Sequence, residues 1–461
     1  MNFQVIVLAG GGGSQSKELF PLVTKDLPKP LLPVGNRPLI SYALELLESS
    51  GIKDLIVAVP GDEAATQVQN WILNAFDDRL HVVVESVPED CETADILRKI
   101  AHRLTATDFV VVSGDLISDV PLGAVAATHR RQGAVMTSLL YHRPNVSSSD
   151  VTTSSPAKDK LKQPTSDIIG LDSTHQYLLF LASRGQVEKD LKIRRSLLQA
   201  VGQMEVHTDL IDAQLYAFNT KLVQEVLETR PGIKSIKHDL VPYLIRSQLR
   251  PGSGSIPPAA VSSDESSDNL PGVLVGDRAP QSPNPADEVA NLLRRVCSVS
   301  PPPLKCCAYI ASQANYCARV SSLPAYMDIN RAVAGEVVHL TGHEVSKQNN
   351  VVHATAVLGS RTTVGTSCIV GEGSQMGDKC KIKRSVVGRH CRFGSNVTIT
   401  NSVVMNYVTL EDHCSIQGSV ICSNAHLQQR SSLKDCQVGA SYNVAENSEH
   451  REEAMVKKEK S

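Results

Sequence analysis

From Phe3 to Arg143, short apolar runs alternate with segments whose apolar residues recur at helical spacing. The apolar runs are Phe3 to Leu8, Leu55 to Val59, Val82 to Val84 and Phe109 to Val112. Strands separated by amphipathic helices are typical of a parallel sheet whose loops gather at the carboxyl ends of the strands. Strand-like patterns resume at Asp167 to Leu181 and at Leu210 to Asn219, after a loop excursion at 144–166 rich in Ser, Thr and Pro. We therefore predict one α/β domain over residues 1–250.

A different period begins near residue 350, where a large apolar residue recurs every five or six positions. The matches are Val352, Leu358, Val364, Val370, Met376, Ile382, Val387, Phe393, Ile399, Val404, Leu410, Ile416, Ile421, Leu427, Leu433 and Val438. Two positions before most of them the residue is small, and several cysteines stand there. Such a hexad is the signature of a parallel β-helix, whose coils bury their inward residues by stacking. We predict a β-helix over 350–440 and a charged, exposed tail over 441–461.

The composition changes between the two periodic regions. Residues 251–303 are rich in Pro, Ser and Gly and include the acidic run Ser262 to Asp268. Because this segment has too little apolar surface to offset its chain entropy, we predict a disordered linker. Its serines either accept phosphate or are ordinary linker residues. Residues 304–349 are assigned to a segment that closes the first domain and connects it to the β-helix.

The charge balance excludes a general nucleic-acid binder. Lysine and arginine number 46 against 48 aspartates and glutamates, which leaves a net charge of −2. No apolar run reaches the roughly 18 residues of a membrane span, and Met1 to Ala9 lacks the basic residues of a signal peptide. The eleven cysteines include no CxxC motif, so reduced thiols are expected. We expect a protein of the cytosol, with no membrane and no direct nucleic-acid contact.

A glycine-rich turn follows the first predicted strand. Its candidate phosphate-binding residues are Gly10, Gly11, Gly13 and Ser14. Backbone N–H groups in such a turn can approach a phosphate, beside which Lys29 of the PKPLLPV stretch would add a cation, although the glycines alone suit a tight turn equally well. Together with Val110 to Asp115, these stretches resemble the nucleotidyltransferases that make nucleotide sugars. The resemblance implies a Rossmann-like domain and a left-handed β-helix, with Asp115 where that family holds Mg²⁺.

The chain departs from that family at three positions that carry the chemistry. Gln15 stands where the family has an arginine that stabilises the transferring phosphoryl group, and Glu92 stands where a glycine lets the backbone approach the base. Arg319 replaces a second metal-binding carboxylate, and its charge would repel Mg²⁺ by about 4 kcal/mol at an effective dielectric of about 20. The sugar-phosphate motif has only Glu188 to Asp190 as its nearest counterpart. We expect a vestigial nucleotide pocket without catalytic residues, metal or cofactor.

Other polar clusters suit structural roles better than chemistry. His339 and His343 have the spacing of a metal pair on a helix, but Gly342 between them indicates a turn. Three histidines take outward or corner positions of the hexad, which favours surface residues over an acyltransferase base; they are His390, His413 and His426. Asp209 and Asp212 are expected to be edge or loop carboxylates.

Segments in both modules also resemble one family of exchange-factor subunits. They are Ser113 to Ile117, His207 to Ala213, Leu240 to Leu244, Arg319 to Ser321, Thr398 to Asn406 and Ser415 to Cys422. These segments are similar to the gamma subunits of eukaryotic translation initiation factor 2B (eIF2B), the guanine nucleotide exchange factor for initiation factor 2. Epsilon subunits of that factor have the same two modules, but they carry a further helical domain that performs exchange. We expect no room for that domain in the short stretch from Ala440 to Ser461.

The resemblance implies a non-catalytic partner subunit. Such a chain would pair directly with an epsilon subunit, in a complex that also contains alpha, beta and delta subunits, and would help to bind initiation factor 2. One alternative is a nucleotide-sugar pyrophosphorylase subunit of the GDP-mannose or ADP-glucose type, which would need the missing arginine and second carboxylate. Another is a hexapeptide-repeat acyltransferase, which would leave the whole predicted α/β domain unused.

Overall fold

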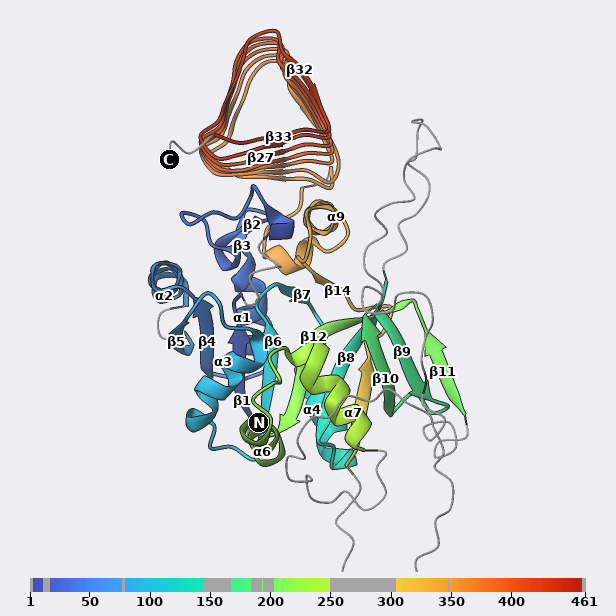
Figure 1. Cartoon of the computed structure of the whole chain (residues 1–461). Coiled ribbons are helices and arrows are strands. Elements are labelled where there is room, and N and C mark those ends of the chain that lie inside the picture. Colours follow the sequence, from blue (N-terminus) through green and yellow to red (C-terminus); the bar gives the residue numbers. More distant parts are fainter. Residues whose placement is uncertain are drawn as a thin grey trace, which may run out of the picture.

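The computed structural model describes residues 3–10, 17–76, 79–143, 167–183, 193, 203–248, 304–346 and 348–457. The loop excursion at 144–166, the linker at 251–303 and the segment Glu188 to Asp190 lie outside the described residues. Figure 1 shows an α/β domain with a triangular stack of coils seated on it. The predicted fold class, an α/β domain followed by a parallel β-helix, is confirmed.

A seven-stranded mixed sheet forms the core of the α/β domain. In spatial order its strands are β13 (Cys306–Ile310), β8 (Met136–His142), β12 (Leu210–Asn219), β6 (Asp108–Ser113), β1 (Phe3–Leu8), β4 (Asp54–Pro60) and β5 (His81–Val87). The four strands predicted between Phe3 and Val112 are parallel, whereas β12 runs antiparallel to both of its neighbours. Strand β13 comes from beyond the linker and pairs with β8, so the segment that precedes the β-helix completes this sheet.

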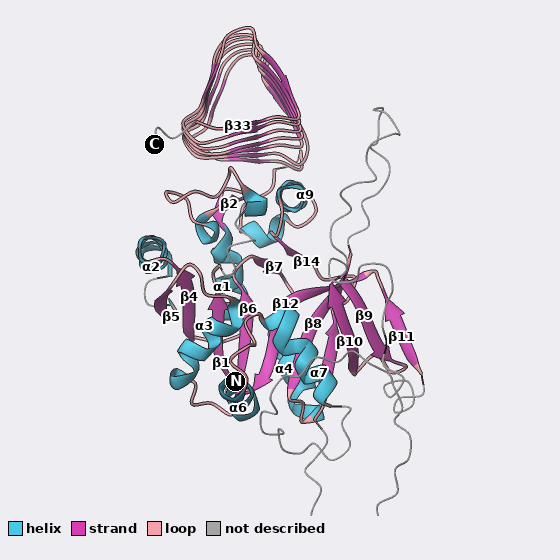
Figure 2. Ribbon diagram, viewed as in Figure 1, coloured by secondary structure: helices cyan, strands magenta, loops and turns pink. Residues whose placement is uncertain are grey.

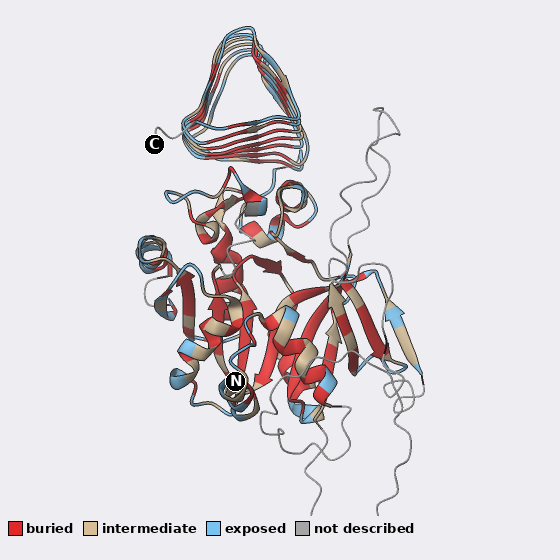
Figure 3. Cartoon of the chain, viewed as in Figure 1, coloured by how far each residue is buried: buried red, intermediate tan, exposed pale blue. Residues whose placement is uncertain are grey.

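Helices cover both faces of the sheet (Figure 2). They are α1 (Leu39–Ser49), α2 (Asp62–Phe76), α3 (Thr93–Ile100), α4 (Leu122–Gln132), α6 (Thr220–Thr229) and α7 (Val241–Ser247). Val5 and Val7 of β1 pack with α1, α2 and α4, while Ile6 and Leu8 pack with α3, α6 and α7. The central strands are therefore buried on both sides, as Figure 3 shows. In the described part of the chain, no helix is long and apolar enough to cross a membrane.

Smaller elements surround this core. One sheet has the order β10 (Leu178–Ser183), β9 (Asp167–Asp172) and β11 (Met204–His207), with β11 at an edge. Two-stranded sheets join β7 (Leu116–Ser118) to β14 (Cys317–Arg319) and β2 (Pro33–Val34) to β3 (Arg37–Pro38). Helix α9 (Leu323–Ala334) follows β14, and the Ser322 side chain caps its amino end by accepting from the Ala325 N–H.

The β-helix consists of three parallel sheets that form the sides of a triangle (Figure 1). The first sheet contains β15 (Val351–Val352), β18 (Ile369–Val370), β21 (Val386–Val387), β24 (Val403–Val404), β27 (Val420–Ile421), β30 (Gln437–Val438) and β33 (Ala454–Met455). The second contains β16 (Val357–Leu358), β19 (Gln375–Met376), β22 (Arg392–Phe393), β25 (Thr409–Leu410), β28 (His426–Leu427) and β31 (Asn443–Val444). The third contains β17 (Thr363–Val364), β20 (Lys381–Lys383), β23 (Thr398–Thr400), β26 (Ser415–Gln417), β29 (Ser432–Lys434) and β32 (Glu449–Arg451).

The predicted inward positions form the core of this stack. From Val370 to Val438 every one of them is at most 6% exposed, so the period is confirmed. Small residues are buried beside them, including five cysteines: Cys368, Cys380, Cys391, Cys414 and Cys436. Leu358 of the first coil is 41% exposed, because the described stack begins with that coil.

The corners of the coils have left-handed backbone, which the hexad of apolar residues does not reveal. Asparagine, which tolerates this conformation, takes it at Asn396, Asn401, Asn424 and Asn447. His390 and His413 occupy such corners with φ of 53° and 61°. His426 lies outward on β28 and pairs with Glu411, its Nε2 atom 3.0 Å from a carboxylate oxygen. All three histidines are thus surface or corner residues, as the hexad predicts.

The prediction of an exposed tail from residue 441 is wrong. Strands β31, β32 and β33 add a further coil, in which Val444 is 1% exposed and Met455 is 7% exposed. Both residues continue the repeat from Leu427 and Val438. The charges of this segment mislead because they take outward positions, as Glu449 does on β32, while the inward positions on β31 and β33 stay apolar. The inward position of β32, in register with Leu433, is His450.

The β-helix rests on the α/β domain through one of its sides. The outward residues of its first sheet pack in one apolar cluster with helix α9; they are Val351, Ile369, Val386, Val403 and Val420. Tyr326, Ile329 and Val333 supply the α9 side of this contact. The Asn36 side-chain amide also donates to the Val387 carbonyl at 2.7 Å. The two modules therefore share a continuous buried interface.

Replacing Ile416 by Asp tests the stacked core. The change puts an unpaired carboxylate between two coils, and we expect it to lower the free energy of unfolding by about 3–5 kcal/mol. Ser415→Asp is the matched control, because Ser415 precedes Ile416 on β26 but points to solvent. Urea unfolding of the full chain measures both, and equal stability of the two variants would contradict the inward position of Ile416.

Candidate functional site

The candidate site lies at the carboxyl ends of β1 and β6, as expected for parallel strands. The N–H of Gly114, which follows β6, donates to the Leu8 carbonyl at 2.8 Å. A Cβ atom on Gly114 would lie 2.9 Å from the Cα of Ala9, so glycine is needed for this close approach. The next residue, Asp115, is thereby placed in the interior and is 4% exposed.

Two cations from distant parts of the chain bind the Asp115 carboxylate. Lys29 begins the short helix η2 (Lys29–Leu31), and its Nζ lies 2.6 Å from Oδ2 of Asp115. Arg319 ends β14, whose pairing with β7 sets it opposite Leu116. The Arg319 Nε donates to Oδ1 at 2.8 Å and its Nη2 donates to Oδ2 at 3.0 Å. This is the bidentate geometry of a strong arginine–carboxylate pair.

Asp115 has no acceptor capacity left after these contacts. The Ser113 hydroxyl also donates to Oδ1, at 2.7 Å. A carboxylate offers about four lone-pair sites, and the four donors from Lys29, Arg319 and Ser113 fill them. Burial alone would raise the pKa of Asp115, but the charges of Arg319 and Lys29 hold that pKa well below its ordinary value. A magnesium ion would have to displace Arg319 or Lys29 to reach the carboxylate.

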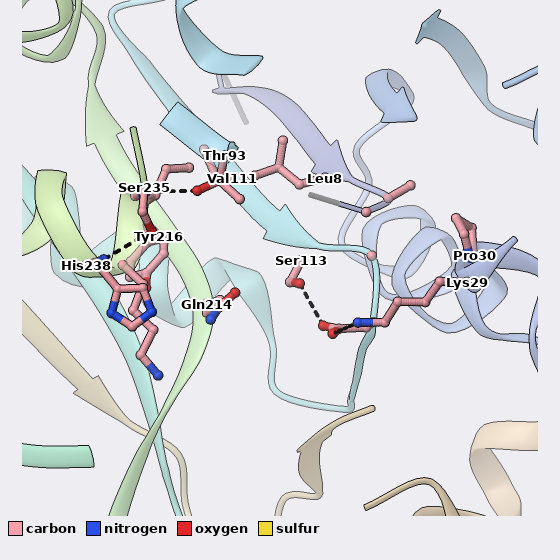
Figure 4. A pocket seen from close by; sticks show the side chains of 16 residues that line it. Leu8, Lys29, Pro30, Thr93, Val111, Ser113, Gln214, Tyr216, Ser235 and His238 are labelled. Atoms are coloured by element: carbon pink, nitrogen blue, oxygen red, sulfur yellow. Dashed lines mark hydrogen bonds and ion pairs between the residues drawn. The ribbon is translucent and has the colours of Figure 1, made fainter. Parts of the chain in front are cut away.

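A cleft opens beside this carboxylate. Its lining includes Gly10, Lys29, Thr93, Asp115, Gln214, Tyr216, Ser235, Lys237 and His238. Figure 4 shows Lys29 and Ser113 on one side, with Thr93, Tyr216, Ser235 and His238 gathered on the other. The Thr93 hydroxyl accepts from the Ile236 N–H at 2.8 Å, which ties the start of α3 to the segment before α7.

The fold brings together most of the predicted site residues that it describes. Gly10, Lys29 and Asp115 line one cleft, and Arg319 lies against Asp115. Glu92 is the N-cap residue of α3, immediately before Thr93 of the cleft lining. The remaining predicted residues, Gly11, Gly13, Ser14 and Gln15, lie outside the described residues.

The sequence did not point to the far wall of the cleft. Ser235, Lys237 and His238 lie far beyond Asp115 along the chain, and no recognisable motif marks them. Lys237 is also held by Asp167, with 2.8 Å between its Nζ and the carboxylate Oδ2. The adjacent lysine and histidine are the only local signal that could have suggested a polar wall.

The expectation that Asp212 is an edge or loop carboxylate is wrong. Asp212 is 1% exposed and accepts hydrogen bonds from the hydroxyl groups of Tyr216 and Ser138. Burial raises its pKa. Asp209, in contrast, is exposed and lies 3.0 Å from Nδ1 of His142.

The expected turn at Gly342 is present. Gly342 has a φ of +67° and ends the short helix η9 (Val338–Thr341), which carries His339. His339 lies 3.4 Å from Asp119, and among the described residues neither it nor His343 forms part of a group with metal-ligand spacing.

Comparisons with known proteins agree with this architecture. Residues 4–149 match the nucleotidyl transferase family, and residues 346–449 match the left-handed β-helix (LbH) domain of eIF2B subunit epsilon. The fold and the site therefore define a nucleotidyltransferase-type domain joined to a left-handed β-helix. Over most of its length the chain is similar to the gamma subunit of translation initiation factor eIF2B.

The similarity is spread over both modules. The gamma subunit of Dictyostelium discoideum is 28% identical over 84% of this chain and 87% of its own length. The gamma subunit of Schizosaccharomyces pombe is also 28% identical, over 83% of this chain and 74% of its own. A mannose-1-phosphate guanyltransferase of Emericella nidulans is 34% identical, but only over 28% of this chain and 35% of its own length. The resemblance predicted from the sequence motifs is confirmed.

Removing the Arg319 charge tests the role of the buried ion pair. Arg319→Met leaves Lys29 as the remaining cation on Asp115, and we expect a loss of about 3 kcal/mol in the free energy of unfolding. Arg331→Met is the control, since the exposed Arg331–Asp328 pair contributes about 0.5 kcal/mol or less. Equal denaturation midpoints for Arg319→Met and Arg331→Met would contradict the account.

Proposed function

We propose that this chain is a non-catalytic subunit of an eIF2B-type guanine nucleotide exchange factor. The similarity to gamma subunits over more than four-fifths of the chain supports this assignment. The guanyltransferase of Emericella nidulans matches only 28% of the chain, whereas the β-helix matches a domain of the exchange factor itself. Location in the cytosol belongs to the same proposal.

The observation that carries the non-catalytic part of the proposal is the saturation of Asp115. Nucleotidyl transfer to a sugar phosphate relies on Mg²⁺ to neutralise the charge of the nucleotide phosphates. The four donors on Asp115 occupy the coordination sites that the metal would need. The pocket that holds Gly10, Lys29 and Asp115 is therefore a vestigial nucleotide site, in which an internal ion pair replaces the metal.

We further propose that the chain acts by holding and positioning an epsilon subunit. The β-helix rests on α9 through one side, so the two modules present one combined surface to a partner. At the beginning of the stack, Val357 and Leu358 are 59% and 41% exposed. Apolar side chains left open at the end of a sheet are typical of a surface that another chain covers. Alpha, beta and delta subunits would complete the complex, which acts on initiation factor 2.

The first experiment tests the enzyme alternative. The purified full chain is incubated with GTP, mannose 1-phosphate and Mg²⁺, and the release of pyrophosphate is measured against a guanyltransferase. We expect no release above buffer, because Asp115 cannot coordinate the metal while Arg319 and Lys29 bind its carboxylate. Turnover that disappears in Asp115→Asn would support a pyrophosphorylase and contradict the proposal.

The second experiment tests the exchange function. Release of GDP from initiation factor 2 should be negligible with this chain alone, measurable with an epsilon subunit alone, and clearly faster when the two are combined. Leu358→Glu should weaken co-purification with epsilon by placing a charge on the apolar end of the stack. Asn443→Glu is the matched control, because Asn443 lies outward at the other end of the same sheet. An unchanged epsilon rate, with no co-purification of the wild-type chain, would contradict the proposal.

A further inference from the structure

A second cluster of polar side chains lies at the edge strand β11, in the small sheet far from the β-helix (Figure 1). Glu205 and His207 are two residues apart on β11, so their side chains share one face of the strand. His175 comes from the turn between β9 and β10. The Asp172 side chain fixes that turn, because it accepts from the backbone N–H groups of Gln176 and Tyr177 at 2.9 and 2.8 Å.

The three side chains have the spacing of metal ligands. The Nε2 of His175 lies 2.7 Å from Oε2 of Glu205, and the Nε2 of His207 lies 3.8 Å from the same oxygen. All three ligand atoms are within 4.8 Å of one another. Ligands of a tetrahedral zinc ion, each about 2.0–2.1 Å from the metal, are about 3.3 Å apart. Small side-chain rotations would therefore bring the cluster to zinc geometry.

An unsatisfied atom points to a missing ligand at this place. The Nε2 of His207 is buried and has no hydrogen-bond partner. Its other ring nitrogen, Nδ1, lies 3.7 Å from a carboxylate oxygen of Asp209. A carboxylate behind a ligating histidine fixes the ring orientation and raises its basicity in many zinc sites. The Nε2 of His207, which has no hydrogen-bond partner, is therefore available to a metal ion at this position.

The donor set selects the kind of metal. Two imidazoles and one carboxylate suit Zn²⁺, which three protein ligands bind while a fourth position stays open. Mg²⁺ and Ca²⁺ prefer oxygen ligands throughout and would not gain from the two histidines. Among the described residues, this is the one group of His, Cys, Asp or Glu side chains with such spacing.

We propose that His175, Glu205 and His207 form a zinc site that fastens the edge strand β11 to the β9–β10 turn. The ion would join two segments that lie 30 residues apart in the sequence. The bound zinc would hold the outer strand of the small sheet in place. The proposal does not depend on the exchange function, because the cluster shares no residue with the Asp115 pocket.

Zinc titration of the full chain tests the proposal. The protein carries an affinity tag without histidines, is stripped with EDTA, and is titrated with Zn²⁺ in a calorimeter. We expect one ion per chain, and we expect His207→Ala and Glu205→Gln each to weaken binding by about tenfold or more. His81→Ala is the control, because His81 is exposed on β5. No zinc binding, or binding that both site variants retain unchanged, would overturn the proposal.

Cobalt substitution identifies the ligands in the wild-type chain, even if a variant fails to fold. Co²⁺ held by two imidazoles and a carboxylate gives visible absorption bands without the charge-transfer band of a cobalt–thiolate bond. That spectrum would support the site. A thiolate band would show instead that the metal binds the chain's cysteines, and it would overturn the proposal.

Discussion

The buried pair between Arg319 and Asp115 is the contact on which the arrangement of this chain depends. It joins the end of β6 to β14, two segments that are 204 residues apart in the sequence. The pair forms in the interior, where an arginine without its carboxylate would be strongly destabilising. Because β14 leads directly into α9, the same contact fixes the start of the helix on which the β-helix rests.

Helix α9 contacts both the segment beside the pocket and the β-helix. The Asn330 side chain of α9 accepts from the Gly35 N–H at 3.0 Å, and the Tyr326 hydroxyl donates to the Pro33 carbonyl at 2.7 Å. Pro33 belongs to the PKPLLPV stretch that supplies Lys29, and Gly35 directly follows that stretch. Helix α9 also packs on the first sheet of the β-helix. Hydrogen bonds and apolar packing thus connect the segment after Lys29, helix α9 and the first sheet of the β-helix.

Local sequence patterns predict most of the fold. The strands of the α/β domain are marked by apolar runs, and those of the β-helix are marked by the five- or six-residue repeat. The hexads located the inward residues from Val370 to Val438, and the apolar runs located the parallel strands. The last coil was missed because charged residues fill its outward positions, although Val444 and Met455 keep the repeat. The sequence does not reveal the left-handed corners, because residue types as different as Asn396 and His413 occupy them.

The candidate site was predictable only as far as motifs mark it. Lys29 and Asp115 stand in recognisable stretches, and Arg319 was expected to repel a metal. That Arg319 also satisfies Asp115 depends on the pairing of β14 with β7, which no local pattern reveals. The same limit hid the burial of Asp212, whose partners Ser138 and Tyr216 come from two strands.

The proposal that an internal ion pair occupies the position of the metal can be tested directly. The most direct measurement is a crystal structure of the full chain, from crystals grown with GTP and Mn²⁺. Anomalous scattering then locates any bound manganese. The account predicts no manganese at Asp115, with the Arg319 guanidinium still bidentate on the carboxylate. A manganese ion coordinated by Asp115, with Arg319 turned away, would contradict it.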